Sequence, residues 1–484
     1  MMRYEPNLKS LRQHRVPDWF NNAKLGIMIH WGLYSIPAYA PTGHGTSTEI
    51  LMHEGFKSYF PNMPYAEWYI NSLRIPGSPV QKYHRENYGD SFSYYDFAAE
   101  FKRTSAKWSP EDWGDRFKEA GARYIVFVTK HMDGFLMWPS SIPNYRIPGY
   151  QSERDIVGEL AAAMRARDIK LGLYYSSLLD QSYTTKPMTD ITGLYSEAGP
   201  IDRKYSEYQY SHWIELIDRY QPSIMWGDIG YPPGTNPLSL FAYFYNKIAD
   251  GVVNDRWAQN PLIVHKIVRT RLGRALVNAY AARVVAKGEG RQPLPPHYDF
   301  TTPEYATSQQ MSDKKWESNR GTANSFSYNR METEADYITL PALIRLLVDT
   351  VSKNGNLMLD VGPMADGTIP EIQANLLKGL GAWMKVNGEA IYDTKTWVRA
   401  EGELRNGGGV RFTQKGDALY VFLMDGQETG EIVIKGLAAM ADCSARDIAS
   451  GQSVQSRREG DDLALDLPQM TVSTPVRVLA LTGK

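Results

Sequence analysis

Five polar residues at the ends of apolar segments could take part in chemistry. His30, His131 and Asp228 each lie at the end of a strongly apolar run of the sequence. Tyr174 and Arg256 lie at matching places in two further runs. An isolated His or Tyr more often satisfies a buried hydrogen bond than carries out chemistry. Parallel strands, however, bring their carboxyl ends to one face, so the recurrence of polar residues there predicts an active site.

These residue types fit glycoside hydrolysis better than other hydrolytic reactions. No serine lies in the glycine context of a nucleophile elbow, and the single cysteine, Cys443, lies far along the chain, so acyl transfer is not favoured. Metal-dependent hydrolysis would have only His30, His131 and Asp228 as strand-end ligands, with no HxH or HExxH pair. Paired carboxylates among aromatic rings and hydroxyl-binding side chains are typical of glycosidases.

The aromatic residues are unevenly distributed. The chain has 12 Trp, 31 Tyr and 15 Phe, and after Trp397 only Phe412, Tyr420 and Phe422 remain in the last part of the 484-residue chain. Aromatic rings can stack on the apolar face of a sugar, so the aromatic excess before Trp397 agrees with a sugar-binding region. The composition therefore predicts two regions with different roles.

Charge and the amino-terminal sequence narrow the partners and the location. The 53 basic and 54 acidic residues give a net charge of −1, which argues against nucleic acid or an anionic membrane as a partner. No run reaches the roughly 18 apolar residues of a transmembrane helix, and the first residues do not resemble a signal peptide. With one cysteine and no possible intrachain disulfide, we expect a cytoplasmic protein.

Short apolar strands alternate with helical patterns from about residue 20 to 390. Amphipathic spacing predicts helices over Asp155–Arg167 and Leu340–Lys353, and Ser109-Pro110 predicts a helix start. This alternation favours an α/β fold, a (β/α)8-like TIM barrel, over residues 1–397. The expected strands are 25–31, 124–131, 170–177, 223–228, 251–256 and 356–362.

Residues 398–484 have a different pattern. Short β-rich runs are separated by turns rich in Gly, Asp and Ser, which predicts a C-terminal antiparallel β-sandwich. The region has no cluster of His, Cys or carboxylate residues, so a module that packs against the barrel is the better interpretation. The expected strands are 409–413, 419–424, 431–436, 463–467 and 476–482.

A basic helical insertion is expected at about 258–296. Its central part, residues 261–291, has helical composition and a single acid, Glu289. A solvent-exposed helix or a contact in a homo-oligomer is the simpler interpretation, and a lid over an acidic or oligosaccharide substrate is the alternative. The basic residues are Lys266, Arg269, Arg271, Arg274, Arg283, Lys287 and Arg291.

Several motifs, in the order of the chain, resemble those of the α-L-fucosidases of glycoside hydrolase family 29. The resemblance implies a retaining exo-glycosidase without a cofactor or metal, which removes terminal α-L-fucosyl residues from oligosaccharides or glycoconjugates. The motifs are WFNNAKLGIMIHWGLYSIP (19–37), PYAEWYINSLRI (64–75), KHMDGF (130–135), GLYYS (172–176), MWGDIGYP (225–232), VNDRW (253–257), NSFSYNR (324–330) and NGNLMLDVGPMADGTIP (354–370).

The resemblance also implies roles for individual residues. The Trp-x-Asp motif of the family nucleophile matches Trp226-Gly227-Asp228 and makes Asp228 the nucleophile. The general acid/base follows a His-x-Asp-Phe stretch, here residues 297–300, and is therefore Glu304, with Glu317 and Glu67 as competitors. Positions that match sugar-contacting residues are His30, Glu67, Trp68, His131, Tyr174, Trp226, Arg256 and Phe326.

One position departs from the family pattern. The family usually has two adjacent histidines where this chain has His131-Met132, and a methionine cannot make a strong hydrogen bond to a sugar hydroxyl. Gly227 is also small and could widen the pocket. These two positions would permit hydrolysis of a related α-L-sugar, such as an α-L-galactoside. A glycan-binding protein that has lost catalysis is a separate alternative, although both candidate carboxylates are present.

Overall fold

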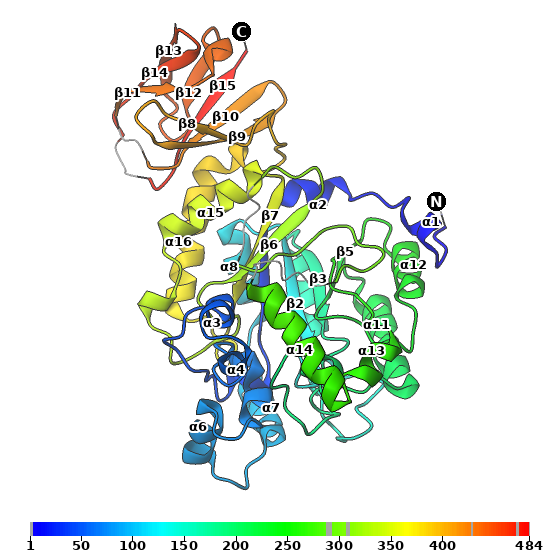
Figure 1. The fold of residues 1–484 in the computed structure, drawn as a ribbon. Coiled ribbons are helices and arrows are strands. Elements are labelled where there is room, and N and C mark those ends of the chain that lie inside the picture. Colours follow the sequence, from blue (N-terminus) through cyan, green and yellow to red (C-terminus); the bar gives the residue numbers. More distant parts are fainter. Residues whose placement is uncertain (1–2, 287–292, 306–309, 427–428, 471–473, 484) are drawn as a thin grey trace.

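The centre of the protein is a curled sheet of seven parallel strands (Figure 1). The computed structural model describes residues 3–286, 293–305, 310–426, 429–470 and 474–483. The strand order in the sheet is β5-β4-β3-β2-β1-β7-β6. The strands are β1 Leu25–Ile29, β2 Tyr124–Lys130, β3 Lys170–Tyr175, β4 Ile224–Gly227, β5 Val252–Val253, β6 Trp316–Gly321 and β7 Gly355–Val361.

Burial explains which of these strands the sequence predicts. Every residue of β1, β2 and β7 is buried, as expected of parallel strands with helices on the outer face of the sheet. Their continuous apolar runs are therefore visible in the sequence. β6 was not predicted, because WESNRG has four polar residues and no apolar run.

The segment 299–305 lies between β5 and β6, at the two ends of the sheet. The Asp299 amide donates to the Val253 carbonyl on β5 at 2.9 Å, and the Glu317 amide on β6 donates to the Thr301 carbonyl at 2.8 Å. Two isolated parallel bridges join the same segment to β6. The fold is therefore α/β, with seven strands in one curled parallel sheet and this short segment between its outer strands.

Two helices that pack on the sheet, α8 and α9, begin at side chains that cap their first turns. Ser109 accepts the Asp112 amide at the start of α8, as the sequence predicts, and Asp155 accepts the Gly158 amide at the start of α9. The α-helices are α1 Leu8–Leu11, α2 Asp18–Ala23, α3 Ser47–His53, α4 Phe56–Tyr59, α5 Tyr69–Leu73, α6 Pro79–Tyr88, α7 Phe97–Ser105, α8 Pro110–Ala120, α9 Ile156–Arg165, α10 Gly193–Ser196, α11 Arg203–Tyr220, α12 Pro237–Lys247, α13 Leu262–Ile267, α14 Arg271–Ala286, α15 Leu340–Ser352 and α16 Glu371–Asn387.

A separate antiparallel sheet of eight strands follows α16, in the order β11-β14-β13-β12-β15-β10-β9-β8. Its outer strands approach each other, since the Lys435 amide donates to the Glu403 carbonyl at 3.0 Å. Figure 1 shows this sheet beside α15 and α16, where Arg411 pairs with Asp349 at 2.6 Å. The strands are β8 Glu401–Glu403, β9 Gly409–Lys415, β10 Ala418–Leu423, β11 Gly430–Ile434, β12 Ser444–Asp447, β13 Ser453–Glu459, β14 Asp462–Leu467 and β15 Arg477–Thr482.

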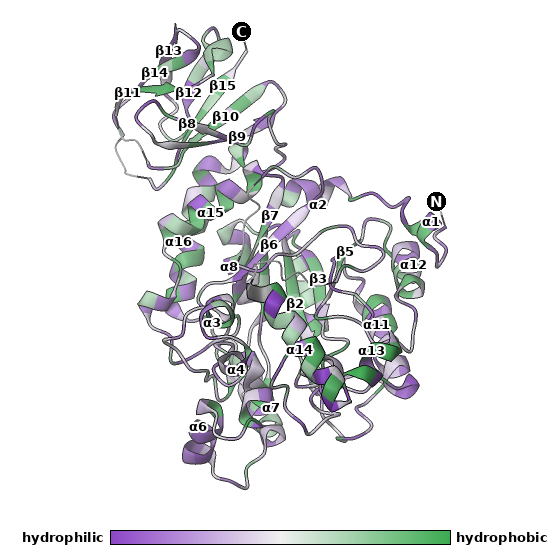
Figure 2. Cartoon of the chain, in the orientation of Figure 1, coloured by the Kyte–Doolittle hydropathy of each residue, from purple (hydrophilic) through white to green (hydrophobic). Residues whose placement is uncertain are grey.

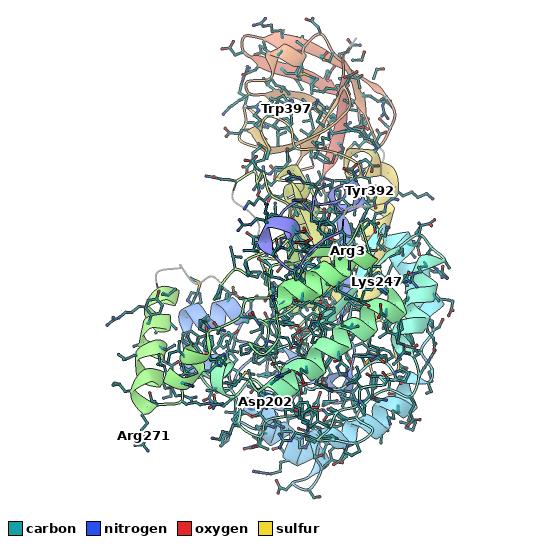
Figure 3. All side chains as sticks on the ribbon, turned by 90° about the vertical axis from the view of Figure 1, so that its right-hand side faces the viewer. Arg3, Asp202, Lys247, Arg271, Tyr392 and Trp397 are labelled. Atoms are coloured by element: carbon teal, nitrogen blue, oxygen red, sulfur yellow. The ribbon has the colours of Figure 1, made fainter. Side chains whose placement is uncertain are left out.

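The basic segment forms two helices, α13 and α14, in which hydrophobic and hydrophilic residues alternate along the ribbon (Figure 2). Arg274 pairs with Asp190 at 2.9 Å and Glu197 at 3.1 Å, whereas Arg271 lies at the outer end of α14 (Figure 3). Residues 287–292 of the predicted helical segment lie outside the described residues. The exposed apolar residues are Leu262, Ile263, Ile267, Leu272, Leu276 and Tyr280.

None of the helices in the described part of the chain is both long and apolar enough to cross a membrane.

Candidate active site

Asp228 lies directly after β4, at the carboxyl-terminal end of the parallel sheet. It is 8% exposed. Its Oδ2 accepts a hydrogen bond from the Tyr174 hydroxyl on β3 at 2.7 Å, and its Oδ1 contacts Arg256 Nη1 at 3.1 Å. Burial raises the pKa of Asp228, Arg256 lowers it, and nearby Glu304 raises it again. The carboxylate is thus held by two donors in a site from which most water is excluded.

Arg256 connects Asp228 to a second carboxylate. The same Nη1 that contacts Asp228 also pairs with Glu304. The Arg256 side chain is 6% exposed, and its guanidinium lies over the Trp226 ring, 4.8 Å from the centroid. The neighbouring carboxylates outweigh the effect of burial and raise its pKa. Because each contact spans about 3 Å, the two carboxylate oxygens lie within about 6 Å of each other.

Glu304 and Glu317 occupy different environments. Glu304 lies in the segment 299–305, contacts Arg256, and has a side chain that is 34% exposed. Glu317 on β6 is fully buried and accepts hydrogen bonds from the Tyr124 hydroxyl at 2.7 Å and from Trp226 Nε1 at 3.1 Å. Burial raises its pKa to about 7. Both carboxylate oxygens of Glu317 therefore accept hydrogen bonds within the buried space that the curled sheet encloses, whereas the Glu304 side chain is partly exposed to solvent.

A series of ring contacts extends from Asp228 to the other candidate residues. The Tyr174 ring stacks on Trp226 at 5.5 Å and on His131 at 5.7 Å between centroids. His131 meets the edge of His30 at 5.6 Å, and His30 lies against Phe326 at 5.5 Å. Side chains from β3, β4 and the loops after β1, β2 and β6 thus form one continuous aromatic surface beside the nucleophile candidate.

His30 is oriented by a residue that the sequence did not identify. Its Nδ1 contacts Asp360 Oδ2 at 2.6 Å, and both residues are buried. Burial alone would lower the pKa of His30, but Asp360 outweighs it and raises the pKa. A raised pKa favours the protonated imidazole, in which Nε2 is also a hydrogen-bond donor. Asp360 lies within the apolar run of β7, and its sequence position gives no signal of this contact.

The pKa of His131 is shifted in the opposite direction from that of His30. Burial lowers its pKa well below the usual value, so the imidazole is neutral, and the backbone of Glu67 opposes this shift only partly. Across the described residues, its Nδ1 has no hydrogen-bond partner. Two imidazoles whose pKa values are shifted in opposite directions thus lie side by side, which suits the recognition of hydroxyl groups.

Glu67 and Trp68 come from the short helix η2, Ala66–Trp68. Glu67 Oε2 accepts hydrogen bonds from the Ser327 amide at 3.1 Å and the Ser327 hydroxyl at 2.7 Å, which fixes the loop that carries Phe326. The ring contact of Trp68 is with Phe60 at 6.4 Å, outside the series that joins the other candidates. The site residues that were chosen from the sequence therefore form one compact group, and Trp68 lies at its margin.

Gly227 does not widen the pocket. A Cβ atom at this position would lie 2.7 Å from the Trp257 indole, and because side chains alternate along a strand it would point to the face opposite that of Trp226. The Asn254 side chain pairs with both the amide and the carbonyl of Gly227 at 2.9 Å. The small residue therefore allows close packing of Trp257, which corrects the interpretation made from the sequence.

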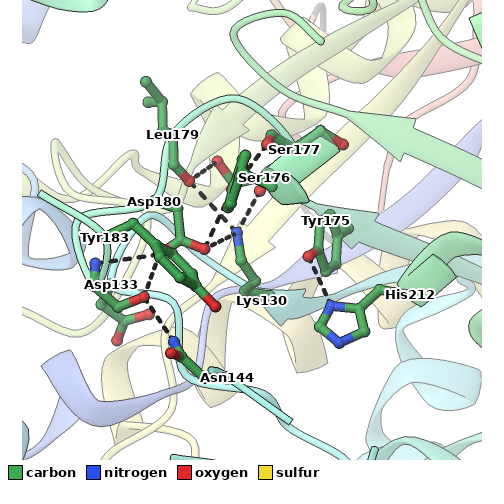
Figure 4. Close-up of polar contacts among 12 residues, drawn as sticks. Lys130, Asp133, Asn144, Tyr175, Ser176, Ser177, Leu179, Asp180, Tyr183 and His212 are labelled. Atoms are coloured by element: carbon green, nitrogen blue, oxygen red, sulfur yellow. Dashed lines mark hydrogen bonds and ion pairs between the residues drawn. The ribbon is translucent and has the colours of Figure 1, made fainter. Parts of the chain in front are cut away.

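A buried charge cluster supports the loops behind His131 (Figure 4). Lys130 is fully buried and contacts Asp180 Oδ2 at 3.1 Å, the Ser176 carbonyl at 2.5 Å and the face of the Tyr175 ring at 4.5 Å. Burial lowers the pKa of Lys130, and Asp180 opposes that effect. The cluster fixes the carboxyl ends of β2 and β3 relative to each other.

Met132 is fully buried within the main apolar cluster. Its carbonyl accepts the Gln181 amide at 2.6 Å. The methionine therefore packs into the core beside the charge cluster. The hydrogen bond that the family histidine would make has no counterpart at this side chain, because a thioether is a weak acceptor and no donor.

The fold and the site together are those of a glycoside hydrolase. A curled parallel sheet positions two carboxylates, an arginine and two histidines at its carboxyl-terminal end, beside an aromatic surface. Comparison with known proteins identifies the family. The α-L-fucosidase family model matches residues 1–389, and the chain belongs to this family.

Similar proteins extend over nearly the whole chain. Human tissue α-L-fucosidase is 31% identical over 437 residues, which are 88% of this chain and 80% of that protein. A crystal structure of Thermotoga maritima α-fucosidase in complex with fucose has a TM-score of 0.83 and 36% identity, and covers 99% of this chain and 100% of the other. The same enzyme in complex with a mechanism-based inhibitor has a TM-score of 0.84. The resemblance found in the sequence is confirmed.

Proposed function

We propose that this α-L-fucosidase removes terminal α-L-fucosyl residues from oligosaccharides or glycoconjugates with retention of configuration, using Asp228 and Glu304. One observation carries the proposal: both carboxylates contact the same nitrogen of Arg256. A separation of about 5–5.5 Å is typical of retaining enzymes, whereas inverting enzymes separate the carboxyl groups by about 6.5–9.5 Å. The shared nitrogen supports the shorter separation.

The reaction has two steps. Asp228 attacks the anomeric carbon and forms a glycosyl ester, while Glu304 donates its proton to the departing glycosidic oxygen. Glu304 then removes a proton from water, which attacks the same carbon and releases Asp228 as a carboxylate. The partial exposure of Glu304 supports its role in the second step, because water must reach it. Tyr174 and Arg256 stabilise the ionised Asp228.

The other candidate residues bind the sugar. His30, through Nε2, and His131, whose Nδ1 has no partner among the residues that the structure describes, recognise neighbouring hydroxyl groups, and Tyr174, Trp226 and Phe326 provide the aromatic surface. Glu67 and Trp68 complete the site from η2. The Thermotoga relative was solved with fucose, which supports a fucosyl group as the ligand of this chain. An α-L-galactoside remains the alternative substrate, with Met132 as the position in its favour.

We extend the proposal to the architecture of the protein. The segment 299–305 takes the place of an eighth strand and closes a (β/α)8-like barrel over residues 1–397, with the basic insertion at about 258–296. Residues 398–484 form a β-sandwich module that supports the barrel. The hydrogen bonds of Asp299 and Thr301 to the outer strands support the closure.

Further predictions concern assembly and location. A homo-oligomer would form through the exposed apolar residues of α13 and α14, and sedimentation velocity of the full chain at increasing concentration tests it. The absence of nucleic-acid and membrane partners and the cytoplasmic location stay predictions from the sequence.

Hydrolysis of an aryl α-L-fucoside tests the proposed function directly. Wild-type protein should release the phenol at a rate well above that from the matching α-L-galactoside, and the product should retain the α configuration by NMR. An Asp228→Gly variant should be inactive. Normal turnover by this variant, or initial release of the β-anomer, would refute the assignment.

A further inference from the structure

Thr302 makes the contacts that orient Arg256. Arg256 Nε donates to the Thr302 hydroxyl at 2.7 Å, and Nη2 donates to the Thr302 carbonyl at 2.7 Å. Thr302 is 5% exposed and lies two residues before Glu304. Of the three nitrogens of the guanidinium, Thr302 therefore holds two, and the third, Nη1, contacts both Asp228 and Glu304.

Asp255 determines which way the Thr302 hydroxyl donates. Its Oδ1 contacts the Thr302 hydroxyl at 2.7 Å and also accepts the Thr302 amide at 3.1 Å. A carboxylate can only accept, so the hydroxyl proton points at Asp255 and a lone pair is left for Arg256 Nε. Without this acceptor, the hydroxyl could turn its proton toward the guanidinium. The order Asp255, Thr302, Arg256 is therefore fixed by the donor and acceptor types.

The contacts among Asp255, Thr302 and Arg256 also link the loop after β5 to the segment 299–305, which carries Glu304. Asp255 and Arg256 follow β5, whereas Thr302 and Glu304 belong to the segment 299–305. The contacts between Thr302 and these two residues consequently set the distance between the Glu304 backbone and the end of β5. A planar guanidinium held at two of its nitrogens cannot rotate, so its third nitrogen is fixed in space.

We propose that Thr302 and Asp255 act together as a positioning pair, which holds Arg256 Nη1 between the nucleophile and the general acid/base. The proposal rests on the proposed function, because it takes Asp228 and Glu304 as the two reacting carboxylates. In this proposal Thr302 acts through its contacts with Arg256, and Asp255 acts through Thr302. Their effect on the reaction passes entirely through the orientation of Arg256.

Steady-state kinetics of Thr302 variants test the pair. Thr302→Val keeps the shape and both backbone contacts but removes the hydroxyl, whereas Thr302→Ser keeps the hydroxyl. We expect Thr302→Val to lower kcat on an aryl α-L-fucoside by on the order of 10- to 100-fold, with KM changed by less than about threefold, because small misplacement of catalytic groups costs about this much. Thr302→Ser should recover most of the wild-type kcat.

A control separates positioning from general damage to the core. Thr350 is fully buried on α15, and its hydroxyl has no hydrogen-bond partner among the described residues. Thr350→Val is therefore the same exchange at a site remote from the reaction, and its kcat should equal that of the wild type. A Thr302→Val variant with wild-type kcat, or a Thr302→Ser variant as slow as Thr302→Val, would overturn the proposal.

A double-mutant cycle gives a second, independent test. Asp255→Ala should lower kcat about as much as Thr302→Val, and combining the two should cause little further loss, because each alone breaks the same chain of contacts. Losses that multiply in the double variant would show two independent effects and contradict the pair. If Asp228→Gly is inactive while Thr302→Val turns over normally, only this inference fails. If Asp228→Gly is active, the proposed function fails as well.

Discussion

The two proposed catalytic carboxylates are supported by different kinds of structure. Asp228 follows β4, which is hydrogen-bonded to β3 on one side and β5 on the other. Glu304 lies on a short segment that forms backbone hydrogen bonds with β6 through isolated bridges, and the side chains of Asp299 and Thr302 add contacts to β5 and to Arg256 after it. Their side chains are 12% and 34% exposed, respectively.

This difference agrees with the two roles. A nucleophile must meet one carbon atom at a fixed distance, and a regular sheet provides that rigidity. An acid/base must exchange protons first with the leaving oxygen and then with water, so it needs access to solvent. A short segment at the edge of the sheet, with the Glu304 side chain 34% exposed, can provide both position and access.

Replacing the proposed acid/base, Glu304, tests the difference between the two carboxylates most directly. Glu304→Gln should lower kcat by about 10²- to 10⁴-fold, the usual contribution of general acid/base catalysis. Because a dinitrophenolate leaves without a proton, the loss in the first step should be much smaller on a dinitrophenyl fucoside. Initial rates on the two aryl substrates measure this dependence on the leaving group.

Glu317→Gln is the matched variant for this test. It should lower kcat by less than about tenfold, the factor that about 1.4 kcal/mol represents. If the large, leaving-group-dependent loss occurs at Glu317 instead, the assignment of the acid/base is wrong.

The strand side of the site depends on the buried cluster in Figure 4. Lys130→Met leaves Asp180 buried without its cation, which should reduce the free energy of unfolding by about 3–5 kcal/mol. Urea denaturation followed by circular dichroism measures the change. Lys82→Met, at an exposed pair with Glu86, should cost less than about 1 kcal/mol. Equal losses in both variants would mean that the buried pair does not support the strand ends.

The pH dependence of stability sharpens the contrast between Glu317 and the catalytic pair. Burial raises the pKa of Glu317 from 4.5 to about 7, so the folded state binds this proton more tightly than the unfolded state. Its contribution is complete below about pH 4.5 and is lost as the pH rises to about 7. Relative to Glu317→Gln, the wild type should lose about 3 kcal/mol over this range. Parallel stability curves for the two proteins would contradict the shift.

The sequence predicted the parts of the protein that depend on continuous apolar runs. β1 to β5 and β7 were found because both faces of each strand are buried, and Asp228 and Tyr174 follow from their places at strand ends. The antiparallel region was recognised from its turns, although β8, β12 and β13 were missed because they are short or largely polar. The family motifs added Glu304, Glu67 and Phe326, which lie outside the regular strands and long helices and have no periodic signal.

The remaining features depend on contacts between residues far apart in the chain. β6 and the segment 299–305 contain many polar residues whose side chains bind other parts of the site, since Glu317 binds Tyr124 and Trp226 and Thr302 binds Arg256. Asp360 looks like part of an apolar strand until the fold brings it to His30. Thr302 carries no local signal at all, because its role depends on the positions of Asp255 and Arg256 after β5.

Trapping the glycosyl-enzyme tests the central claim, that Asp228 is the nucleophile and Glu304 the acid/base, most directly. A 2-fluoro-fucosyl fluoride slows hydrolysis of the ester, so incubation followed by peptide mass spectrometry locates the label. The account predicts one added 2-fluoro-fucosyl group, on Asp228, and label that accumulates also in Glu304→Gln, because fluoride leaves without a proton. A label on Glu304 or Glu317, or rapid turnover with no ester at any residue, would contradict it.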